Sequence, residues 1–225
     1  MLYQADNLNK QFGSEQILKD ISLKMEKGEI ITFLGPSGCG KSTLLRILAG
    51  LEDYDSGKII NNASHTAFIF QEDRLLPWLN LRDNIELVLK DHINDQKKIE
   101  EKIADVLGAV NLAKYNHYLP KELSGGMKQR GAIARALSIE PELLLMDEPF
   151  ANLDFPLRLD LIKLLSKIFA KKRMGGVFVT HDTREAVLLG DKIVIMKDNP
   201  GRIESSIEIT IPKKDRYLES EKISQ

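Results

Sequence analysis

The sequence is short of cysteine and of net charge. Cys39 is the only cysteine among 225 residues, so no disulfide can form within the chain. Lysine and arginine (32) nearly balance aspartate and glutamate (33), which leaves a formal net charge of -1. Proteins that bind nucleic acid mainly through electrostatics usually show a strongly basic balance or face. We therefore expect no nucleic-acid partner.

Long hydrophobic runs and targeting signals are also missing. Apolar runs such as IITFL (30–34) are far shorter than the roughly 18 residues that a membrane-spanning helix needs. The first ten residues, MLYQADNLNK, show neither the basic nor the apolar region of a signal peptide. We therefore expect a cytosolic chain, which another subunit must hold if it works at a membrane. With 225 residues, of which 43% are apolar, the chain can bury a sizeable core, and its length suggests one large domain or two small ones.

Strand-like segments at the start of the chain lead into a glycine-rich loop. A helix with apolar residues at helical spacing is expected from Lys41 to Gly50, directly after this loop. Strand, loop and helix then follow in the order of a phosphate-binding α/β unit. The early strands are expected at 2–5, 21–25 and 29–34, with turns at 11–16 and 26–29.

The pattern changes in the middle of the chain. After a strand at 66–71, the residues from 73 to 137 have mostly helical periodicity, which predicts a helical insertion. Strands return at 143–147, 176–180 and 191–197. Each is almost continuously apolar, as expected of parallel strands that are covered on both faces.

The segment GPSGCGKS, from Gly35 to Ser42, matches the phosphate-binding pattern G-x-x-x-x-G-K-[S/T]. Glycines let backbone N–H groups wrap phosphate oxygens, and the N-terminus of the following helix attracts the same anion. We expect Lys41 to neutralise the β- and γ-phosphates, Ser42 to bind Mg²⁺ and Thr43 to contact an α- or β-phosphate oxygen. A turn that only caps a helix is the alternative, which the preceding strand disfavours. The residues expected to bind the nucleotide are Gly35, Pro36, Ser37, Gly38, Cys39, Gly40, Lys41, Ser42 and Thr43, with Cys39 as a small filler.

Two adjacent acids, Asp147 and Glu148, follow the apolar strand at 143–147. Because side chains alternate along a strand, the two acids should face different ways. We expect Asp147 to hold Mg²⁺ through water and Glu148 to orient or deprotonate the attacking water. A solvated strand end is the alternative. His181 follows the strand at 176–180, at the edge where open α/β sheets bind ligands. A lone histidine is more often structural, but here we expect a contact with the γ-phosphate.

A second turn suited to an anion lies in LSGGMKQR, from Leu123 to Arg130, where two glycines follow a serine and open a helix. It ends the helical insertion, away from the sheet, so it cannot easily serve the nucleotide held by the first loop. Two copies packed head to tail would resolve this, since each turn could cover the γ-phosphate held by the other copy. The residues assigned to nucleotide binding here are Ser124, Gly125, Gly126 and Gln129.

Together these motifs resemble the ATP-binding cassette subunit of an ABC transporter, over nearly the whole chain. The glycine loop, Gln71, the LSGG turn, the acidic strand end, the ANLD turn ending at Asp154 and the THD segment around His181 occur in the family's order. The resemblance implies an α/β fold. Its P-loop NTPase (RecA-like) core would comprise 1–72 and 138–225, with an N-terminal antiparallel β subdomain and an inserted α-helical subdomain at 73–137.

The resemblance also implies an ATP hydrolase that uses Mg²⁺, and it adds three roles. Phe12 would stack on adenine, unless it is a plain core phenylalanine. Gln71 would contact Mg²⁺ and water, and Asp154 would reach across the dimer to the partner's glycine loop. The expected catalytic residues are Glu148, His181, Lys41 and Gln71, and the expected metal ligands are Ser42, Gln71 and Asp147.

The segments RLLPW (74–78), DEPF and NPGRI are similar to the importer branch that serves nitrate, sulfonates, taurine and related solutes, including pyrimidine precursors. This implies a homodimer at the cytoplasmic face of the membrane, membrane permease subunits and, indirectly, a periplasmic or lipid-anchored solute-binding protein. Leu75, Leu76, Pro77 and Trp78 either dock on the permease or pack internally. The alternatives are a soluble ABC ATPase acting on nucleic acid or ribosomes, and a nucleotide-binding module without turnover.

Overall fold

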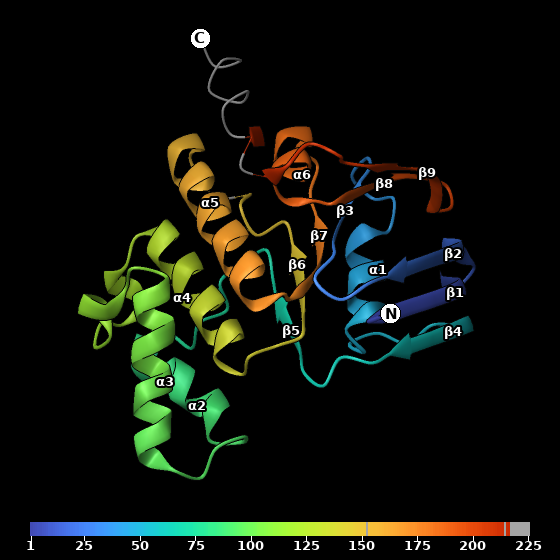
Figure 1. Cartoon of the computed structure of the whole chain (residues 1–225). Coiled ribbons are helices and arrows are strands. Elements are labelled where there is room, and N and C mark those ends of the chain that lie inside the picture. Colours follow the sequence, from blue (N-terminus) through green and yellow to red (C-terminus); the bar gives the residue numbers. More distant parts are fainter. Residues whose placement is uncertain (152, 214, 217–225) are drawn as a thin grey trace.

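The computed structural model describes residues 1–151, 153–213 and 215–216. Figure 1 shows four layers: a small antiparallel sheet, helix α1 (Lys41–Leu48), a larger sheet, and the helices that cover the other face of that sheet. One buried cluster lies on each face of the larger sheet. This arrangement places the start of α1 near the carboxyl ends of the strands of the larger sheet.

The larger sheet has six strands in the order β5-β6-β7-β3-β8-β9, of which the first five are parallel and β9 is antiparallel. Along β6, Leu143 and Leu145 join the buried cluster around α1. Leu144 and Met146 join the cluster on the other face. The predicted parallel strands covered on both faces are therefore confirmed. The strands are β3 (Ile30–Leu34), β5 (Thr66–Ile69), β6 (Leu143–Asp147), β7 (Gly175–Val179), β8 (Lys192–Lys197) and β9 (Arg202–Glu208).

The expected N-terminal antiparallel sheet is present, with strand order β2-β1-β4. Its strands are β1 (Tyr3–Phe12), β2 (Glu15–Met25) and β4 (Ser56–Asn61). The first two run longer than the sequence suggested. The turn expected at 11–16 is reduced to Gly13 and Ser14, and Phe12 pairs with Glu15 across it. Gly13 has a φ of 58°, which a tight hairpin turn requires and glycine adopts without strain.

Helix α1 lies between the two sheets. It shares a buried cluster with Leu8 of β1 and Phe33 of β3. Because apolar side chains contact it from both sheets, α1 is held firmly relative to β3 and to the loop between them. The side chains of α1 that are at most 2% exposed are Leu44, Leu45, Ile47 and Leu48.

Every helix between β5 and β6 belongs to the predicted helical insertion. These are α2 (Leu81–Leu89), α3 (Gln96–Ala109), α4 (Gly125–Ser138) and the short 3-10 helices η1 (Ala113–Tyr115) and η2 (Pro120–Glu122). Their apolar faces share one buried cluster with the large sheet. Because that cluster runs across the expected boundaries at 73 and 137, the division into subdomains stays a proposal.

Four elements were not anticipated from the sequence: β4, β9, α5 (Phe155–Lys172) and α6 (Thr183–Leu189). The signals for α5 were present, since Asp154 caps it and a proline stands in its first turn. By contrast, β9 has mostly exposed side chains at the edge of the sheet. It therefore lacks the apolar pattern that identifies buried strands.

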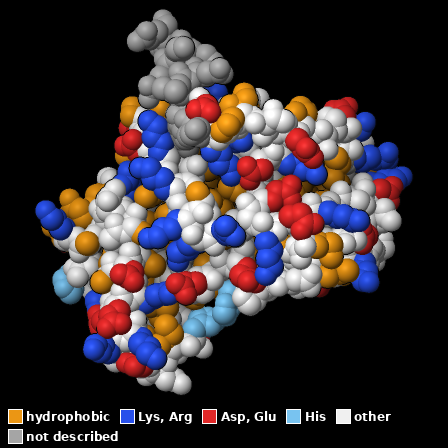
Figure 2. Space-filling view, in the orientation of Figure 1, with side chains coloured by type: hydrophobic (Ala, Val, Ile, Leu, Met, Phe, Trp, Pro, Cys, Tyr) orange, Lys and Arg blue, Asp and Glu red, His pale blue; other side chains and the backbone are white. Residues whose placement is uncertain are grey.

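The surface mixes both signs of charge. Figure 2 shows one face, on which lysine and arginine side chains are interspersed with aspartate and glutamate. Within the described ranges, no helix combines the length and the apolar character that crossing a bilayer requires. The most exposed large apolar side chain among the described residues is Trp78, at 71%.

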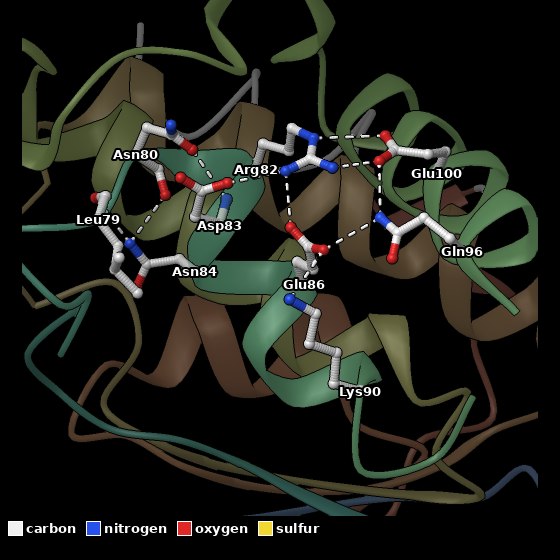
Figure 3. Close-up of polar contacts among 9 residues, drawn as sticks. All are labelled: Leu79, Asn80, Arg82, Asp83, Asn84, Glu86, Lys90, Gln96 and Glu100. Carbon is white, nitrogen blue, oxygen red and sulfur yellow. Dashed lines mark hydrogen bonds and ion pairs between the residues drawn. The ribbon is translucent and has the colours of Figure 1, made fainter. Parts of the chain in front are cut away.

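A network of charged groups joins α2 to α3 (Figure 3). Arg82 of α2 donates to Glu86 in its own helix and pairs with Glu100 of α3. Gln96 of α3 donates to both acids at 3.1 Å. The hydrogen bonds from Gln96 and Lys90, together with the charge of Arg82, hold the pKa of Glu86 below its usual value.

Replacing Glu86 with glutamine is expected to lower the free energy of unfolding at neutral pH by roughly 1 kcal/mol, because charge-assisted bonds become neutral ones. A carboxylate with a lowered folded pKa stabilises the protein above its unfolded pKa of about 4.3, and this contribution is lost as pH falls through the folded pKa. The difference from wild type should therefore shrink below about pH 5. Urea unfolding at neutral and acid pH measures it, with Glu101→Gln, an exposed acid on α3, as control. An equal difference at both pH values would contradict the assignment.

Candidate functional site

The glycine loop connects β3 to α1 at the carboxyl edge of the large sheet. Gly40 is the N-cap of α1, with φ 89° and ψ 10°, a left-handed conformation that favours glycine. A Cβ atom there would lie 2.7 Å from Leu18 Cδ2, so β2 also excludes a larger residue. Gly40 offers no side-chain oxygen, and the first N–H groups of an α-helix have no partner within the helix. These N–H groups therefore remain for an anion such as phosphate.

Lys41 folds back over the loop. Its Nζ donates to the carbonyl oxygens of Gly35 and Pro36, both at 2.8 Å, and the side chain is 6% exposed. Phosphate oxygens placed in the loop would offer the same ammonium a charged acceptor, which is the stronger partner. Cys39 is buried, 1% exposed, beside Lys41 Nζ, as a small filler should be. At the tip, Pro36, Ser37 and Gly38 are exposed, while Ser42 and Thr43 are half-buried.

Ser42 and Asp147 come together as the sequence predicted. The Ser42 hydroxyl donates to Asp147 Oδ1 at 2.8 Å, which joins the first turn of α1 to the end of β6. Burial raises the pKa of Asp147 above the usual carboxyl value, despite the Ser42 hydrogen bond. A buried carboxylate of this kind lacks sufficient positive charge nearby, and a hydroxyl and a carboxylate are hard oxygen ligands. These two residues therefore fit Mg²⁺.

Glu148 and His181, which the sequence analysis assigned separate roles, lie side by side. Glu148 Oε2 lies 3.2 Å from His181 Nδ1, and the side chains are 23% and 61% exposed. Such exposure excludes the interpretation of His181 as a buried structural histidine. Asp147 and Glu148 face different groups, Ser42 and His181, as predicted for adjacent acids, but strand alternation is only part of the reason. Glu148 has left the strand with a φ of 43°, and its N–H donates to the Val179 carbonyl at 3.0 Å. A non-glycine residue held in this region is strained, which is common at active sites.

The parallel strands bring these groups to one edge of the large sheet. β3 ends at the glycine loop, β6 at Asp147 and β7 just before His181. Gln71 lies two residues beyond β5, the strand next to β6 in the sheet, and its side chain is exposed. The structure therefore places Gln71 at the same edge, while its contact with metal and water stays a prediction.

Phe12 ends β1, with its ring 48% exposed and Lys10 Nζ 4.6 Å from the ring centroid. The alternative interpretation, a core phenylalanine, is therefore wrong. An exposed aromatic face can stack on a planar base. The contact with adenine itself stays a prediction.

The LSGG turn starts α4. Ser124 is the N-cap, and its Oγ accepts from Met127 N at 3.3 Å. Gly125 is exposed with open space beside it, whereas Gly126 is buried and a Cβ there would overlap the Leu157 side chain of α5. α4 packs into the buried cluster on one face of the large sheet and α1 into the cluster on the other. The two turns that the sequence analysis assigned to anion binding therefore begin helices on opposite faces of the sheet (Figure 1).

Two further assigned residues lie in surroundings that the sequence analysis did not anticipate. Gln129 is 5% exposed, and its Nε2 has no hydrogen-bond partner among the described residues. A contact with nucleotide would require this amide to become exposed, so that assignment stays a prediction. Asp154 is exposed and caps α5 by accepting from Leu157 N at 3.0 Å. Its contact with a partner's loop also stays a prediction.

Segment 75–78 contains both a buried and an exposed apolar side chain, so neither alternative, internal packing or docking, describes all of it. Leu75 is 6% exposed and packs in the buried cluster with the insertion helices. Trp78 is 71% exposed. Asn84 of α2 holds the backbone between them by exchanging hydrogen bonds with Leu76, and it also donates to Leu79 O (Figure 3). Leu75 is therefore a core residue, and Trp78 is presented at the surface.

Comparisons with known proteins point to one family. The family described as ABC transporter matches residues 18–151. The aliphatic sulfonates import ATP-binding protein SsuB of a Bacillus cereus strain is 45% identical over 213 residues, covering 91% of this chain and 83% of that protein. SsuB of Bacillus subtilis (strain 168) is 46% identical over 202 residues, covering 86% and 77%.

A solved structure of similar fold is a dimeric, post-hydrolysis state of the ATP-binding cassette MJ0796 bound to ADP and Pi. It has a TM-score of 0.82 and 29% sequence identity, covering 93% of this chain and 100% of that chain.

Proposed function

The chain belongs to the ABC transporter family and is an ATP hydrolase that binds ATP with Mg²⁺, and from this premise we propose that it powers the import of an aliphatic sulfonate. The observation that carries the proposal is the identity of about 45% to sulfonate import proteins over most of both chains. Nitrate, taurine-like compounds and pyrimidine precursors are the other solutes of the expected class. The same relatives favour import over a soluble ATPase that acts on nucleic acid or ribosomes.

In the proposed reaction, the first N–H groups of α1 and the Lys41 ammonium hold the phosphates of ATP. Ser42 and Asp147 would hold Mg²⁺, which supplies positive charge to the phosphate oxygens. Glu148 accepts a proton from the attacking water as the water approaches the γ-phosphate. His181, 3.2 Å from Glu148, fixes the direction of that carboxylate.

We further propose that the site is completed by a second copy of the chain. The LSGG turn and the glycine loop start helices on opposite faces of the sheet, so a head-to-tail pair would bring each turn to the partner's ATP. Ser124 and Gly125 are exposed, as such a contact needs. Asp154 is exposed as well and would meet the partner's glycine loop.

The permease is proposed to contact the surface around Trp78, on the cytoplasmic side of the membrane. An exposed tryptophan is a common anchor of protein interfaces. A solute-binding protein, periplasmic or lipid-anchored, would deliver the solute to the permease.

Trp78→Ala is expected to weaken co-purification with the permease by at least about tenfold, because the anchor side chain is lost. ATP hydrolysis by the isolated protein should be unchanged, since Trp78 is 71% exposed and outside the site. Pull-down from detergent-solubilised membranes measures the first quantity. Ile207→Ala, which removes another exposed apolar side chain on β9, is the control. Unchanged co-purification would contradict the docking assignment.

The experiment that tests the proposed function uses the complex with its permease and solute-binding protein in proteoliposomes. ATP hydrolysis should be stimulated by an alkanesulfonate and accompanied by its uptake. Stimulation by nitrate or by a pyrimidine precursor, with none by an alkanesulfonate, would contradict the proposed solute.

A further inference from the structure

The first turn of α5 contacts two of the segments assigned to nucleotide binding. The side chain of Leu157 packs on Gly126, so the LSGG turn lies directly against this helix. The carbonyl oxygen of Leu153, in the turn that ends at Asp154, accepts from Arg158 Nη2 at 3.1 Å. A shift of the LSGG turn would therefore act on the start of α5.

Arg158 extends this connection to the segment that holds His181. Its Nη1 lies 3.1 Å from Glu185 Oε1 and 3.3 Å from Asp182 Oδ2, and both acids belong to the start of α6. The Glu185 side chain is only 6% exposed, so this pair is largely shielded from water. One guanidinium group thus bonds two segments at once, which its planar fork allows and a lysine ammonium on its flexible stem does less well.

Glu185 in turn fixes the backbone on both sides of His181. The Thr180 hydroxyl donates to Glu185 Oε2 at 2.5 Å and accepts from Asp182 N at 3.0 Å. His181 stands between these two residues. Burial raises the pKa of Glu185, and the Thr180 hydrogen bond and the Arg158 charge oppose that rise. Removal of Arg158 would leave a buried carboxylate without its charge partner, so the local arrangement would change.

We propose that Arg158, acting through Glu185, is a positioning residue that sets His181 against Glu148 and links this geometry to the LSGG turn. The inference rests on the proposed composite site, that is, an ATP site completed by a second copy of the chain. In a head-to-tail dimer the LSGG turn of one chain serves the partner's ATP, while His181 serves the ATP of its own chain. Arg158 therefore connects the two ATP sites through the first turn of α5.

The test compares Arg158→Met with Lys167→Met, which removes an exposed positive charge from the same helix. Arg158→Met should lower kcat for ATP by roughly ten- to a hundredfold, the cost of a small misplacement of reacting groups. KM for ATP should stay within about twofold, because the loop that binds the phosphates is untouched. Arg158→Lys keeps the charge but loses the fork, so its kcat should be intermediate. Glu185→Gln should lower kcat in the same way.

A double variant asks whether Arg158 acts through His181. In single-turnover hydrolysis, the double variant should be less than about twofold slower than His181→Ala alone, since the group that Arg158 positions is already absent. A kcat equal to that of Lys167→Met would overturn the proposal. The proposal would also be overturned if the losses of rate from Arg158→Met and His181→Ala multiplied in the double variant. A lower kcat accompanied by a changed KM and a lower thermal stability would overturn it too.

A separate assay distinguishes failure of this inference from failure of the composite site. Arg158→Met is placed in a Glu148→Gln background, and dimer formation with ATP and Mg²⁺ is measured by size-exclusion chromatography. The positioning role predicts the same dimer as Glu148→Gln alone, whereas a dimer lost only when Arg158 is replaced would overturn it. If Glu148→Gln alone stays monomeric, the composite site is wrong, and the kcat comparison still decides the role of Arg158.

Discussion

Replacing Glu148 with glutamine is expected to slow ATP hydrolysis by at least about a hundredfold while ATP binding is retained. The general base of a hydrolase typically contributes this much or more. Glutamine has nearly the same shape as glutamate but cannot accept the proton of the attacking water. The glycine loop, Lys41 and the Ser42–Asp147 pair, which hold the phosphates and the metal in the proposed reaction, are unaltered.

The same variant should accumulate as an ATP-bound dimer. In the proposed arrangement ATP lies between the two copies, so a dimer that cannot hydrolyse ATP persists. Steady-state hydrolysis and size-exclusion chromatography with ATP and Mg²⁺ measure the two effects. Glu208→Gln, which changes an exposed acid on β9, is the control. Unchanged hydrolysis would contradict the role of Glu148 as the base, and a monomer with bound ATP would contradict the dimer.

Replacing Lys41 with alanine is expected to weaken ATP binding by at least about tenfold, because a charge-assisted bond to phosphate contributes about 1.5–3 kcal/mol. The change also removes two hydrogen bonds within the loop, to Gly35 O and Pro36 O. Equilibrium binding of a fluorescent ATP analogue is therefore measured together with the unfolding temperature. Lys58→Ala, an exposed lysine on β4, is the control. Unchanged affinity in a folded protein would contradict the phosphate role.

The parts of the fold that could be predicted are those with a local signature. The parallel strands were visible because burial on both faces makes them continuously apolar, as in β6. The glycine loop was visible because its residues are fixed by backbone approach to phosphate. β9 was missed because an exposed edge strand has no such pattern. The length of β1 was underestimated because residues 6–11, DNLNKQ, are mostly polar, although they continue the strand.

The parts of the site that could not be predicted depend on contacts between distant segments. Arg158 meets Glu185 from another helix, and nothing in the spacing of the two marks them as partners. The second glycine of the LSGG turn was read as serving an anion, yet Gly126 is also required by its packing on Leu157. The burial of Gln129 follows from the packing of α4, which its neighbours in the sequence do not reveal.

The central claim is that each ATP site is built from two chains, and the structure of Glu148→Gln with ATP and Mg²⁺ tests it most directly. The account predicts a two-fold dimer in which Ser124 of each chain lies about 3 Å from the γ-phosphate held by the partner's glycine loop. A structure in which Ser124 of both chains lies far from every bound triphosphate would contradict it.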